Sequence, residues 1–576
     1  MKNNEIKTID QFVENKVIGN ILDRVKAREK ASDYFLSVVS LSAIAYLYKM
    51  SGNKSNVLKM IPETIKDEMT VIFLTNYAKK YWTDVEAISE TTEASILKDI
   101  VVSYIPTEFN TREIGEFVTP KGVTKLVIQL LDIKKEDIVL NLCSGAANFL
   151  IEASYLNEKP YLIGVDINTS MIQLSNIRTA FTDDLINIIQ GNMLSQDFSK
   201  LQANKVFADF PFMVRGWYEN IRTNKNLYPY FANAKKTVSS DWVYATAAML
   251  TQAKPGRTVI RMSNAGLWNE VDQDIRKTFI LSGLVEAVIS MPEKLLDTTT
   301  IPFTLIILSQ DNKSIRMVDA SEFYTTGRRQ NTLEDNNIQD ILAAYHSNSA
   351  KSKLVTIEEL KEQEYILNPL RYISIPNLAD KMIKSVKLGD IVCTAINRGA
   401  VVKSSELDQL VSTQPTEYQY LMLKDISNGH LNKELPYLVN LDEKYDKFYV
   451  KNGNLIISKI SPFKVAMVEI DDSEKVLANG NLYFLDIDET KANPVYVMLY
   501  LQSEAGMMQL NSLAKGSAMK SISIKDLQKI IIPDIPLKQQ NKIANDYYDL
   551  NNELIVISRQ EVLIRNKIEH LVEEVL

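Results

Sequence analysis

The sequence predicts a protein of the α/β class, with helices at its start, a mostly parallel sheet in its middle and an α+β region with a long helix at its end. Three observations support this prediction. Between about residues 120 and 310, short apolar runs alternate with helical periods, which is typical of a parallel sheet covered by helices on both faces. Beyond about residue 385 the chain is rich in short strands and turn signals, and its last forty residues carry a heptad repeat.

The length and composition of the chain restrict the classes of protein that it can form. Its 576 residues exceed the usual size of one domain severalfold, so we expect about two to four domains. Hydrophobic residues make up 45% and charged residues 24% of the chain, which is typical of globular proteins and argues against disorder as the main feature. The net charge of −7 argues against a uniformly basic surface, but a local basic groove for nucleic acid stays open.

Scarce residue types and missing motifs argue against several chemistries. The two cysteines, Cys143 and Cys393, give no disulfide framework, and with only three histidines we expect no metal site. Neither the serine-hydrolase elbow nor the ATP-binding glycine motif occurs. The polar start, and the lack of a run of about eighteen uncharged apolar residues, predict a cytoplasmic protein without a membrane span.

The first two predicted domains are a helical N-terminal domain at 1–110 and a sheet domain at 111–320. Within the first, segment 36–50 is apolar nearly all round, as a buried helix is, and 84–104 has a weaker amphipathic period. In the second, we expect strands at 137–142, 161–167, 186–191, 204–210, 256–263, 284–290 and 304–310, and helices at 123–131, 148–156, 169–181 and 241–253.

The C-terminal half divides into three predicted segments. Residues 321–384 are polar and charged, and we interpret them as a connector. Residues 385–536 are predicted as a strand-rich α+β domain, because turn signals such as 397–399 separate short apolar runs. Residues 537–576 predict one long helix in a coiled coil, with a long helix packed on its own domain as the alternative. The heptad positions are Ile543, Leu550, Ile557, Ile564 and Leu571, then Tyr547, Leu554, Ile568 and Val575, with Glu561 as the one break.

Three predicted strand ends carry residues suited to nucleoside ligands. The small residues 144–147 let the backbone approach a ligand, although many such turns are small only for packing. Asp166 ends the second strand, where an acid can accept from both hydroxyls of a ribose. In FADFPF (207–212), a carboxylate beside a Pro-Phe step can hold an exocyclic amine while Phe212 stacks on a flipped-out base. A buried aromatic turn is the alternative for this third strand end.

Five motifs in order resemble the modification subunit of type I restriction–modification systems. They are GEFVTP (115–120), NLCSGAANFL (141–150), GVDIN (164–168), GNML (191–194) and ADFPF (208–212), and the runs 239–268 and 275–308 look like the rest of that subunit's catalytic domain. The resemblance implies a Rossmann-like, S-adenosylmethionine-dependent methyltransferase domain that acts on adenine N6 in DNA.

The C-terminal half carries a second resemblance, to the target-recognition domain and spacer helix of a specificity subunit. The runs that carry it are 386–402, 420–431, 450–468 and 516–543. The usual specificity subunit has two such halves and this chain has one. The resemblance therefore implies a homodimer through the C-terminal helix, which restores the missing half by symmetry.

The resemblance also assigns candidate site residues at the matching positions. For catalysis they are Asp209, Phe210, Pro211 and Phe212, and for S-adenosylmethionine they are Thr119, Asn141, Gly145, Ala147, Asp166 and Asn192. For DNA contact we single out cations near predicted loop tips, each of which, taken alone, also fits a solvated surface charge. They are Arg398, Lys403, Lys424, Lys459, Lys464, Lys515 and Lys520.

The chain departs from the family pattern in both motifs. Asn141 and Ala147 replace the usual Asp and Gly of the cofactor turn, and Asn192 replaces an Asp that usually accepts from the adenine of the cofactor. The catalytic motif usually reads Asn-Pro-Pro-Phe or Asp-Pro-Pro-Tyr, and here Phe210 stands in place of the first proline. Without proline's fixed φ, we expect the carbonyl of Phe210 to be aimed less well at the amine.

Two functions therefore stay open. The first is an active adenine-N6 DNA methyltransferase of a restriction–modification or phage-defence system, in which Asp209 and the carbonyl of Phe210 accept the hydrogens of the amine. The second is a DNA-binding recognition subunit that keeps the fold without transferring methyl. Both imply double-stranded DNA as a partner and leave room for a separate translocase or nuclease subunit.

Overall fold

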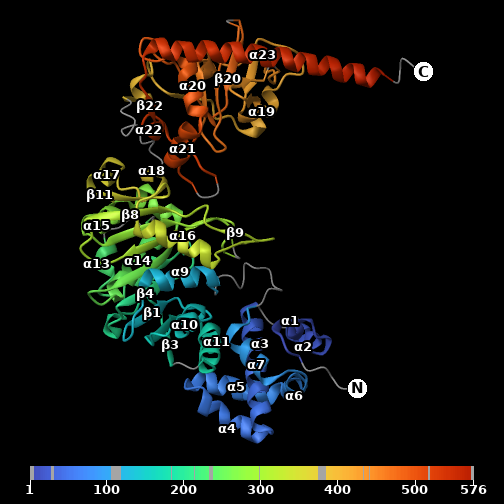
Figure 1. Ribbon diagram of the computed structural model, residues 1–576, viewed down its shortest axis with the longest axis vertical. Coiled ribbons are helices and arrows are strands. Elements are labelled where there is room, and N and C mark those ends of the chain that lie inside the picture. Colours follow the sequence, from blue (N-terminus) through green and yellow to red (C-terminus); the bar gives the residue numbers. More distant parts are fainter. Residues whose placement is uncertain are drawn as a thin grey trace. The chain divides into compact units, whose positions relative to one another are not determined.

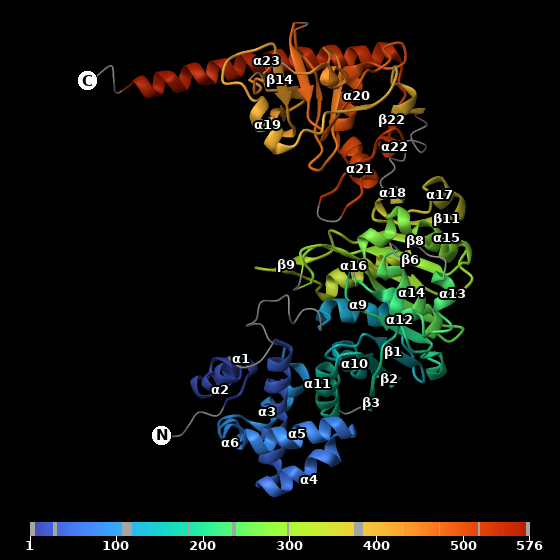
Figure 2. The ribbon, with the colours of Figure 1, turned by 180° about the vertical axis from the view of Figure 1, so that it is seen from behind.

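The computed structural model of the protein describes residues 6–26, 31–105, 118–182, 185–212, 214–232, 238–296, 299–373, 384–432, 434–439, 441–471, 473–516 and 519–571. Contacts divide the chain into two compact units, Met1–Ile373 and Ser374–Leu576 (Figures 1 and 2). The first unit contains a helical bundle and a large sheet, and the second contains several small sheets and a long helix.

Helices open the described part of the first unit, which confirms the helical N-terminus. They are α1 (Ile9–Glu14), α2 (Lys16–Lys26), α3 (Ala31–Ser51), α4 (Lys54–Thr64), α5 (Glu68–Lys80), α6 (Trp82–Thr91) and α7 (Ala94–Ser103). The central helix α3 packs against α4, α6 and α7 and also against α11 of the sheet region. By length and composition its window Asp33–Ser51 suffices to cross a membrane, but 72% of that window is buried inside the unit. An all-round apolar helix is thus explained here by its place in the bundle core.

The large sheet has nine strands in the order β11-β8-β6-β7-β5-β4-β1-β2-β3. The strands are β1 (Ile138–Leu142), β2 (Tyr161–Asp166), β3 (Ile186–Gln190), β4 (Lys205–Ala208), β5 (Arg257–Ser263), β6 (Val285–Ser290), β7 (Phe303–Leu308), β8 (Ser314–Asp319) and β11 (Ser352–Thr356). β7 is antiparallel to β5 and β6, and β11 is antiparallel to β8, while the other neighbours are parallel. The mostly parallel sheet is confirmed, and its order reverses between β1 and β4, where ligands of such sheets bind.

Helices cover both faces of this sheet. One core is shared by the N-terminal bundle, α9 (Lys121–Leu131), α10 (Asn148–Ser154), α11 (Thr169–Ala180) and α16 (Asp335–His346). The other contains α12 (Trp217–Ile221), α13 (Tyr228–Phe231), α14 (Ser240–Thr251), α15 (Gln273–Leu281), α17 (Ile357–Glu362) and α18 (Leu370–Ile373). Successive strand residues enter opposite cores, as Val139 and Leu140 of β1 do, because side chains alternate along a strand.

The predicted connector at 321–384 is wrong for most of its described length. Residues 352–356 form the edge strand β11, which pairs with β8, and α16, α17 and α18 pack on the faces of the sheet. Between β8 and β11, β9 (Thr325–Thr326) and β10 (Asn331–Thr332) form a short hairpin. The segment is polar because edge strands and their helices bury only one stripe of side chains, such as Ile338 and Ile341 of α16.

The second unit combines several small sheets, which fits the predicted α+β region. A four-stranded sheet has the order β13-β21-β18-β19, a three-stranded sheet has the order β14-β20-β17, and β12-β22 and β15-β16 form pairs. The strands are β12 (Ser385–Lys387), β13 (Asn397–Arg398), β14 (Tyr418–Leu421), β15 (Ile426–Ser427), β16 (His430–Leu431), β17 (Tyr449–Val450), β18 (Leu455–Ser458), β19 (Val465–Met467), β20 (Lys475–Ala478), β21 (Leu482–Leu485) and β22 (Ile531–Pro533). The shorter helices are α19 (Ser404–Leu410), α20 (Pro494–Gln502), α21 (Glu504–Leu513) and α22 (Ile524–Leu527).

The last helix, α23 (Leu537–His570), is only partly packed on its own unit. Its first turns contact α20, where Gln540 and Ala544 are buried, and the hydroxyl of Tyr547 lies 2.9 Å from Nε2 of His430. Further along, heptad residues such as Leu554 and Ile557 are exposed, at 61% and 57%. The single long helix is thus present over the described residues, and Val575 of the predicted heptad lies outside them.

Candidate functional site

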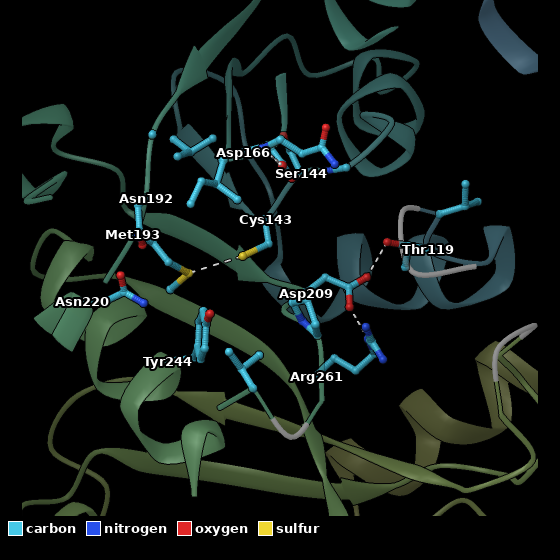
Figure 3. Close-up of a pocket in the computed structure, with 18 of the residues that line it drawn as sticks. Thr119, Cys143, Ser144, Asp166, Asn192, Met193, Asp209, Asn220, Tyr244 and Arg261 are labelled. Atoms are coloured by element: carbon cyan, nitrogen blue, oxygen red, sulfur yellow. Dashed lines mark hydrogen bonds and ion pairs between the residues drawn. The ribbon is translucent and has the colours of Figure 1, made fainter. Parts of the chain in front are cut away.

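A cavity of about 320 Å³ lies at the carboxyl ends of β1, β2 and β4 in the first unit (Figure 3). Of the predicted residues, Thr119, Gly145, Asp166, Asn192, Asp209 and Pro211 line it. Figure 3 shows Asp209 between Thr119 and Arg261, with Asp166 and Ser144 on another side of the hollow. Residues from five separate sequence motifs therefore meet because the sheet order reverses at this point.

The turn between β1 and α10 forms one wall of the cavity. Cys143, Gly145 and Ala147 all have positive φ, of 57°, 51° and 62°, so the backbone is tightly coiled there. Such conformations persist in L-residues only when the surroundings hold them in place. Here the N–H of Ser144 donates to the carbonyl of Val165 (3.0 Å), and the hydroxyl of Ser175 donates to the carbonyl of Gly145 (2.7 Å).

Asp166 joins this turn to the end of β2. Its carboxylate accepts from the backbone N–H of Gly145 and of Asn168, each at 2.8 Å. Burial raises the pKa of Asp166, and the N–H donors of Asn168, Gly145 and Ile167 pull the pKa in the opposite direction. Each carboxylate oxygen keeps lone pairs for further donors, so a ligand with two neighbouring hydroxyls suits this position.

Other groups in the cavity match the remaining parts of a nucleoside. The hydroxyl of Ser144 is buried and has no partner among the described residues. The amide oxygen of Asn192 accepts from the N–H of Leu194 (2.9 Å), which orients this side chain and leaves a second lone pair. Ile167 is 64% exposed although it is apolar, and with Met193 it gives the cavity an apolar surface for a base. Sequence reasoning missed Ile167, whose signal was an apolar residue directly after the strand-ending acid.

Two predicted cofactor residues do not line the cavity. Asn141 is 2% exposed, and its amide donates to the carbonyl of Phe207 on β4 (3.3 Å). Ala147 is fully buried at the start of α10, in the core that the sheet shares with the N-terminal bundle. The assignment of these residues to the cofactor is therefore corrected: Asn141 joins two strands, and the methyl of Ala147 packs in the core. Neither substitution obstructs the cavity.

A buried arginine supports the turn between β1 and α10, and no local pattern in the sequence indicates this role. Arg178 of α11 is 2% exposed and donates to the carbonyl of Val102 (2.6 Å) and to the side-chain oxygen of Asn148 (2.5 Å), and it also donates to the carbonyl of Ala146. Burial lowers the pKa of Arg178 to about 9. In the sequence, it is only a basic residue in the last turn of a helix, a position usually explained by the helix dipole.

The catalytic candidate Asp209 follows β4 and is held on both carboxylate oxygens. The hydroxyl of Thr119 donates to one oxygen (2.5 Å), and Nε of Arg261 donates to the other. The backbone carbonyl of Thr119 also lies 3.5 Å from the side-chain nitrogen of Asn148. A chain of contacts thus runs from Arg178 through Asn148 and Thr119 to Asp209.

Arg261 of β5 also lies close to two other catalytic candidates, Phe210 and Phe212. Its Nη2 lies 3.5 Å from the carbonyl oxygen of Phe210, and its guanidinium lies 4.5 Å from the ring centre of Phe212. The predicted stacking of Phe212 on a base is therefore not what the structure presents, because Arg261 covers this ring. The signal for Arg261 was a charged residue between the apolar residues Ile260 and Met262 of a strand, since charges are rarely buried without a specific partner.

Phe210 is buried in the core, whereas Pro211 lines the cavity. The ring of Phe210 is fully buried and stacks on Tyr244, with ring centres 4.6 Å apart and planes at 18°. Burial also raises the pKa of Tyr244, whose side chain lines the cavity. Pro211 is exposed at the cavity. Only the backbone carbonyl of Phe210 is thus available to a ligand.

The predicted DNA-contacting cations divide into two groups in the second unit. Lys464 donates to the carbonyl of Ile426 (2.6 Å) and Lys515 lies 3.7 Å from Asp526, so both are engaged inside the unit, which corrects their assignment to DNA. Nε of Arg398 donates to the carbonyl of Gly480 (2.8 Å), and the N–H of Lys459 donates to the carbonyl of the next residue, Asn481 (2.7 Å). Burial, and to a lesser extent Arg398, lowers the pKa of Lys459. The carbonyl of Lys520 accepts from the N–H of Ser461 (2.9 Å), which places this loop beside Lys459. Lys403 and Lys424 are exposed elsewhere on the unit.

Comparisons with known proteins give matches for both halves of the chain. Residues 101–381 match the N-6 DNA methylase family, and residues 380–562 match the type I restriction modification DNA specificity domain. The MjaVIII methylase subunit of a type I restriction enzyme from Methanocaldococcus jannaschii is 28% identical over 292 residues, which cover 45% of this chain and 50% of that protein. The HindI methylase subunit from Haemophilus influenzae is 22% identical over 331 residues, 51% of this chain and 71% of that protein.

A solved structure similar to this chain is a type I restriction–modification methyltransferase subunit from Streptococcus thermophilus. It is 18% identical, with a TM-score of 0.46, over 62% of this chain and 98% of that chain. The chain spans about half the length of the first curated relatives that it matches.

Proposed function

We propose that the chain transfers a methyl group from S-adenosylmethionine to adenine N6 in DNA, because residues 101–381 match the N-6 DNA methylase family and residues 380–562 match the type I restriction modification DNA specificity domain. The second unit would choose the DNA site. The observation that carries this proposal is the meeting of Asp166 and Asp209, from separate motifs, in one cavity of about 320 Å³.

The cofactor end of the cavity is the side of Asp166. This carboxylate would accept from the ribose hydroxyls, while Ile167 and Met193 would contact the adenine of the cofactor and Asn192 would hydrogen-bond to its edge. The unpartnered hydroxyl of Ser144 is available to a polar group of the same ligand. When bound, S-adenosylmethionine supplies the methyl group as a sulfonium, so no residue has to activate it.

The target end is the side of Asp209. Adenine N6 is a poor nucleophile because its lone pair is delocalised into the ring. A carboxylate oxygen of Asp209 and the carbonyl of Phe210 would accept the two hydrogens of the amine, which concentrates the lone pair toward the methyl group. Thr119 holds the second oxygen of Asp209 and thus fixes the direction of its acceptors. The amine can lose its surplus proton to water after transfer, so no strong base is required.

Methyl transfer from labelled S-adenosylmethionine to mixed-sequence DNA tests the proposal. Asp209→Ala should abolish incorporation, and Asp197→Ala is the matched control, because this carboxylate accepts from Ser199 and Asn226 and does not line the cavity. Equal incorporation by the unchanged chain and Asp209→Ala would contradict the assignment of Asp209. No incorporation by the unchanged chain, together with no binding of the cofactor, would contradict the activity itself.

One observation favours the second candidate, a DNA-binding subunit that has lost methyl transfer. Arg261 fills the space between Asp209 and Phe212, where the target amine would have to lie. If the unchanged chain and variants at position 261 all bind DNA and cofactor but none of them transfers methyl, this second function is the correct one.

The exposed seam of α23 supports a homodimer as a further part of the proposal. Heptad residues such as Leu550, Leu554 and Ile564 expose 61%, 61% and 57% of their surface, and a second copy of the helix would cover them. A dimer would present two recognition units to double-stranded DNA, with Arg398, Lys459 and Lys520 as the phosphate contacts. We further propose that a separate translocase or nuclease subunit completes the restriction system, and that the protein acts in the cytoplasm, where its DNA substrate is.

A further inference from the structure

The amine subsite of the proposed active site is filled by a side chain of the same protein. The guanidinium of Arg261 donates to the carboxylate of Asp209 (Figure 3). It also lies 3.5 Å from the carbonyl of Phe210 through Nη2 and 4.5 Å from the ring centre of Phe212. These are the acceptor, the second acceptor and the aromatic face that an adenine N6 amine and its ring would use. A planar group with several N–H donors thus copies the polar edge and the stacking of the base.

The position of Arg261 is well defined by its surroundings. It belongs to β5, which pairs in register with β4 and β7, and it is 8% exposed. Its guanidinium also lies 5.9 Å from the ring centre of Phe303 on β7. A base cannot reach Asp209 and the face of Phe212 while the guanidinium is there, because two groups cannot occupy the same space.

We propose that Arg261 is a placeholder for the target base: without DNA it saturates the amine subsite, and the base enters only when the guanidinium leaves. This inference rests on the proposed methyl transfer and adds a specificity-determining residue to it. The exchange replaces an ion pair by a hydrogen bond from a neutral donor to the same carboxylate, so it opposes entry of a base that has no other anchor. A base on DNA is also held through phosphate and recognition contacts, and their binding free energy can offset the loss of the Arg261–Asp209 ion pair.

Arg261 has a second possible role, which the experiment must distinguish from the role of a placeholder. Arg261 could instead be a positioning residue that aims Asp209 and stays in place during the reaction. A placeholder opposes binding of the base, so its removal lowers KM for DNA. A positioning residue contributes after binding, so its removal lowers kcat and leaves KM unchanged.

The test measures kcat and KM for DNA with labelled S-adenosylmethionine and mixed-sequence duplex DNA, using the full chain. The variant is Arg261→Met, which keeps an unbranched apolar side chain and removes the guanidinium with its donors. The matched control is Arg257→Met, the same change on the same strand, where the arginine is 3.0 Å from Glu286 and lies outside the cavity. A hydrogen bond to a charged group is worth about a tenfold factor or more, so we expect KM for DNA to fall about tenfold in Arg261→Met alone.

A second measurement does not depend on how well that variant folds. In Arg261→Ala, free guanidinium ion at millimolar concentration should refill the space and raise KM again, with sodium chloride at the same ionic strength as the comparison. The same ion should leave KM of the unchanged chain and of Arg257→Ala unaffected, because neither has an empty space at the amine subsite; in Arg257→Ala the space lies beside Glu286, outside the cavity. An effect of guanidinium on Arg261→Ala alone supports a guanidinium-shaped subsite, and equal effects on all three chains overturn it.

The outcomes separate the inference from the proposed function. If the unchanged chain transfers methyl and Arg261→Met lowers kcat, or changes nothing, only the placeholder is overturned. If no chain transfers methyl, the proposed function fails and the placeholder fails with it. A gain of transfer at low DNA concentration in Arg261→Met supports both.

Discussion

Replacement of Asp166 by Asn tests the cofactor half of the site, because it removes one charge and keeps the shape of the side chain. In the structure, the two oxygens of Asp166 accept from the N–H of Gly145 and of Asn168, both at 2.8 Å. An amide has one oxygen and one NH2 group, so in the variant one of these N–H donors faces another donor. The change should therefore affect both the fold and the binding of the cofactor, in two separate measurements.

The effect on folding follows from the unpaired backbone N–H. A buried donor without a partner costs about 1–3 kcal/mol, and the midpoint of thermal unfolding should fall by a few degrees. The effect on binding follows from the charge, because a hydrogen bond to a charged acceptor is worth about 1 kcal/mol more than a neutral one. Two ribose hydroxyls then give about 2 kcal/mol, or about a 30-fold weaker Kd for S-adenosylmethionine.

Isothermal titration of the cofactor and thermal melting, on the full chain, measure the two effects. Asp197→Asn serves as the control, since this carboxylate accepts from the N–H of Ser199 (2.9 Å) outside the cavity and should leave Kd unchanged. A lower melting midpoint with an unchanged Kd in Asp166→Asn would refute the role of Asp166 in binding ribose and leave it only the support of the turn.

Three further predictions concern other parts of the chain. Burial raises the pKa of Asp241 from 3.8 to about 6, so the folded state binds more protons than the unfolded state, and this group contributes less to stability as pH rises from about 4 to 6. Asp241→Asn should therefore be more stable than the unchanged chain at neutral pH, by roughly 3 kcal/mol. In thermal melts this advantage should vanish near pH 4. Replacing Lys459 or Arg398 by Gln should weaken binding to all DNA sequences alike and reduce the salt slope of binding by about one, measured by fluorescence anisotropy at several salt concentrations. Ile557→Glu should convert a dimer to a monomer in sedimentation analysis, and a monomeric unchanged chain would contradict the dimer.

The sequence predicts the elements of the sheet region closely, because hydrophobic period and strand-ending turns are local signals. The expected strand at 161–167 is β2 (Tyr161–Asp166), and the expected helix at 169–181 is α11 (Thr169–Ala180). The edge strand β11 was missed because it buries only Ser352 and Val355, so its composition resembles that of a connector. Local pattern cannot tell an edge strand from an exposed loop when pairing partners lie far apart in the sequence.

The site was predictable only where chemistry and position coincide in a motif. Asp166 and Asp209 each end a strand, and parallel strands bring such ends together. The roles of Arg178 and Arg261 were not predictable, because they depend on contacts with carbonyls and carboxylates of distant segments, although the position of Arg261 within a strand was a signal of its burial. For Asn141 the motif predicts a contact with the cofactor, but its side-chain amide donates to a carbonyl of the neighbouring strand instead.

The loss of the first proline in the catalytic motif is less harmful than the sequence indicates. Proline at position 210 would fix φ through its own ring, and we expected the carbonyl of Phe210 to be aimed less well without it. The structure supplies two other restraints on the same peptide. The fully buried ring of Phe210 stacks on Tyr244 at 4.6 Å, so rotation of this residue would have to displace a packed aromatic pair. Pro211 follows directly and restricts the backbone of the residue before it to extended conformations. The carbonyl of Phe210 is therefore held by packing and by its successor rather than by its own ring, and the obstacle to an incoming amine is Arg261, not the direction of the acceptor.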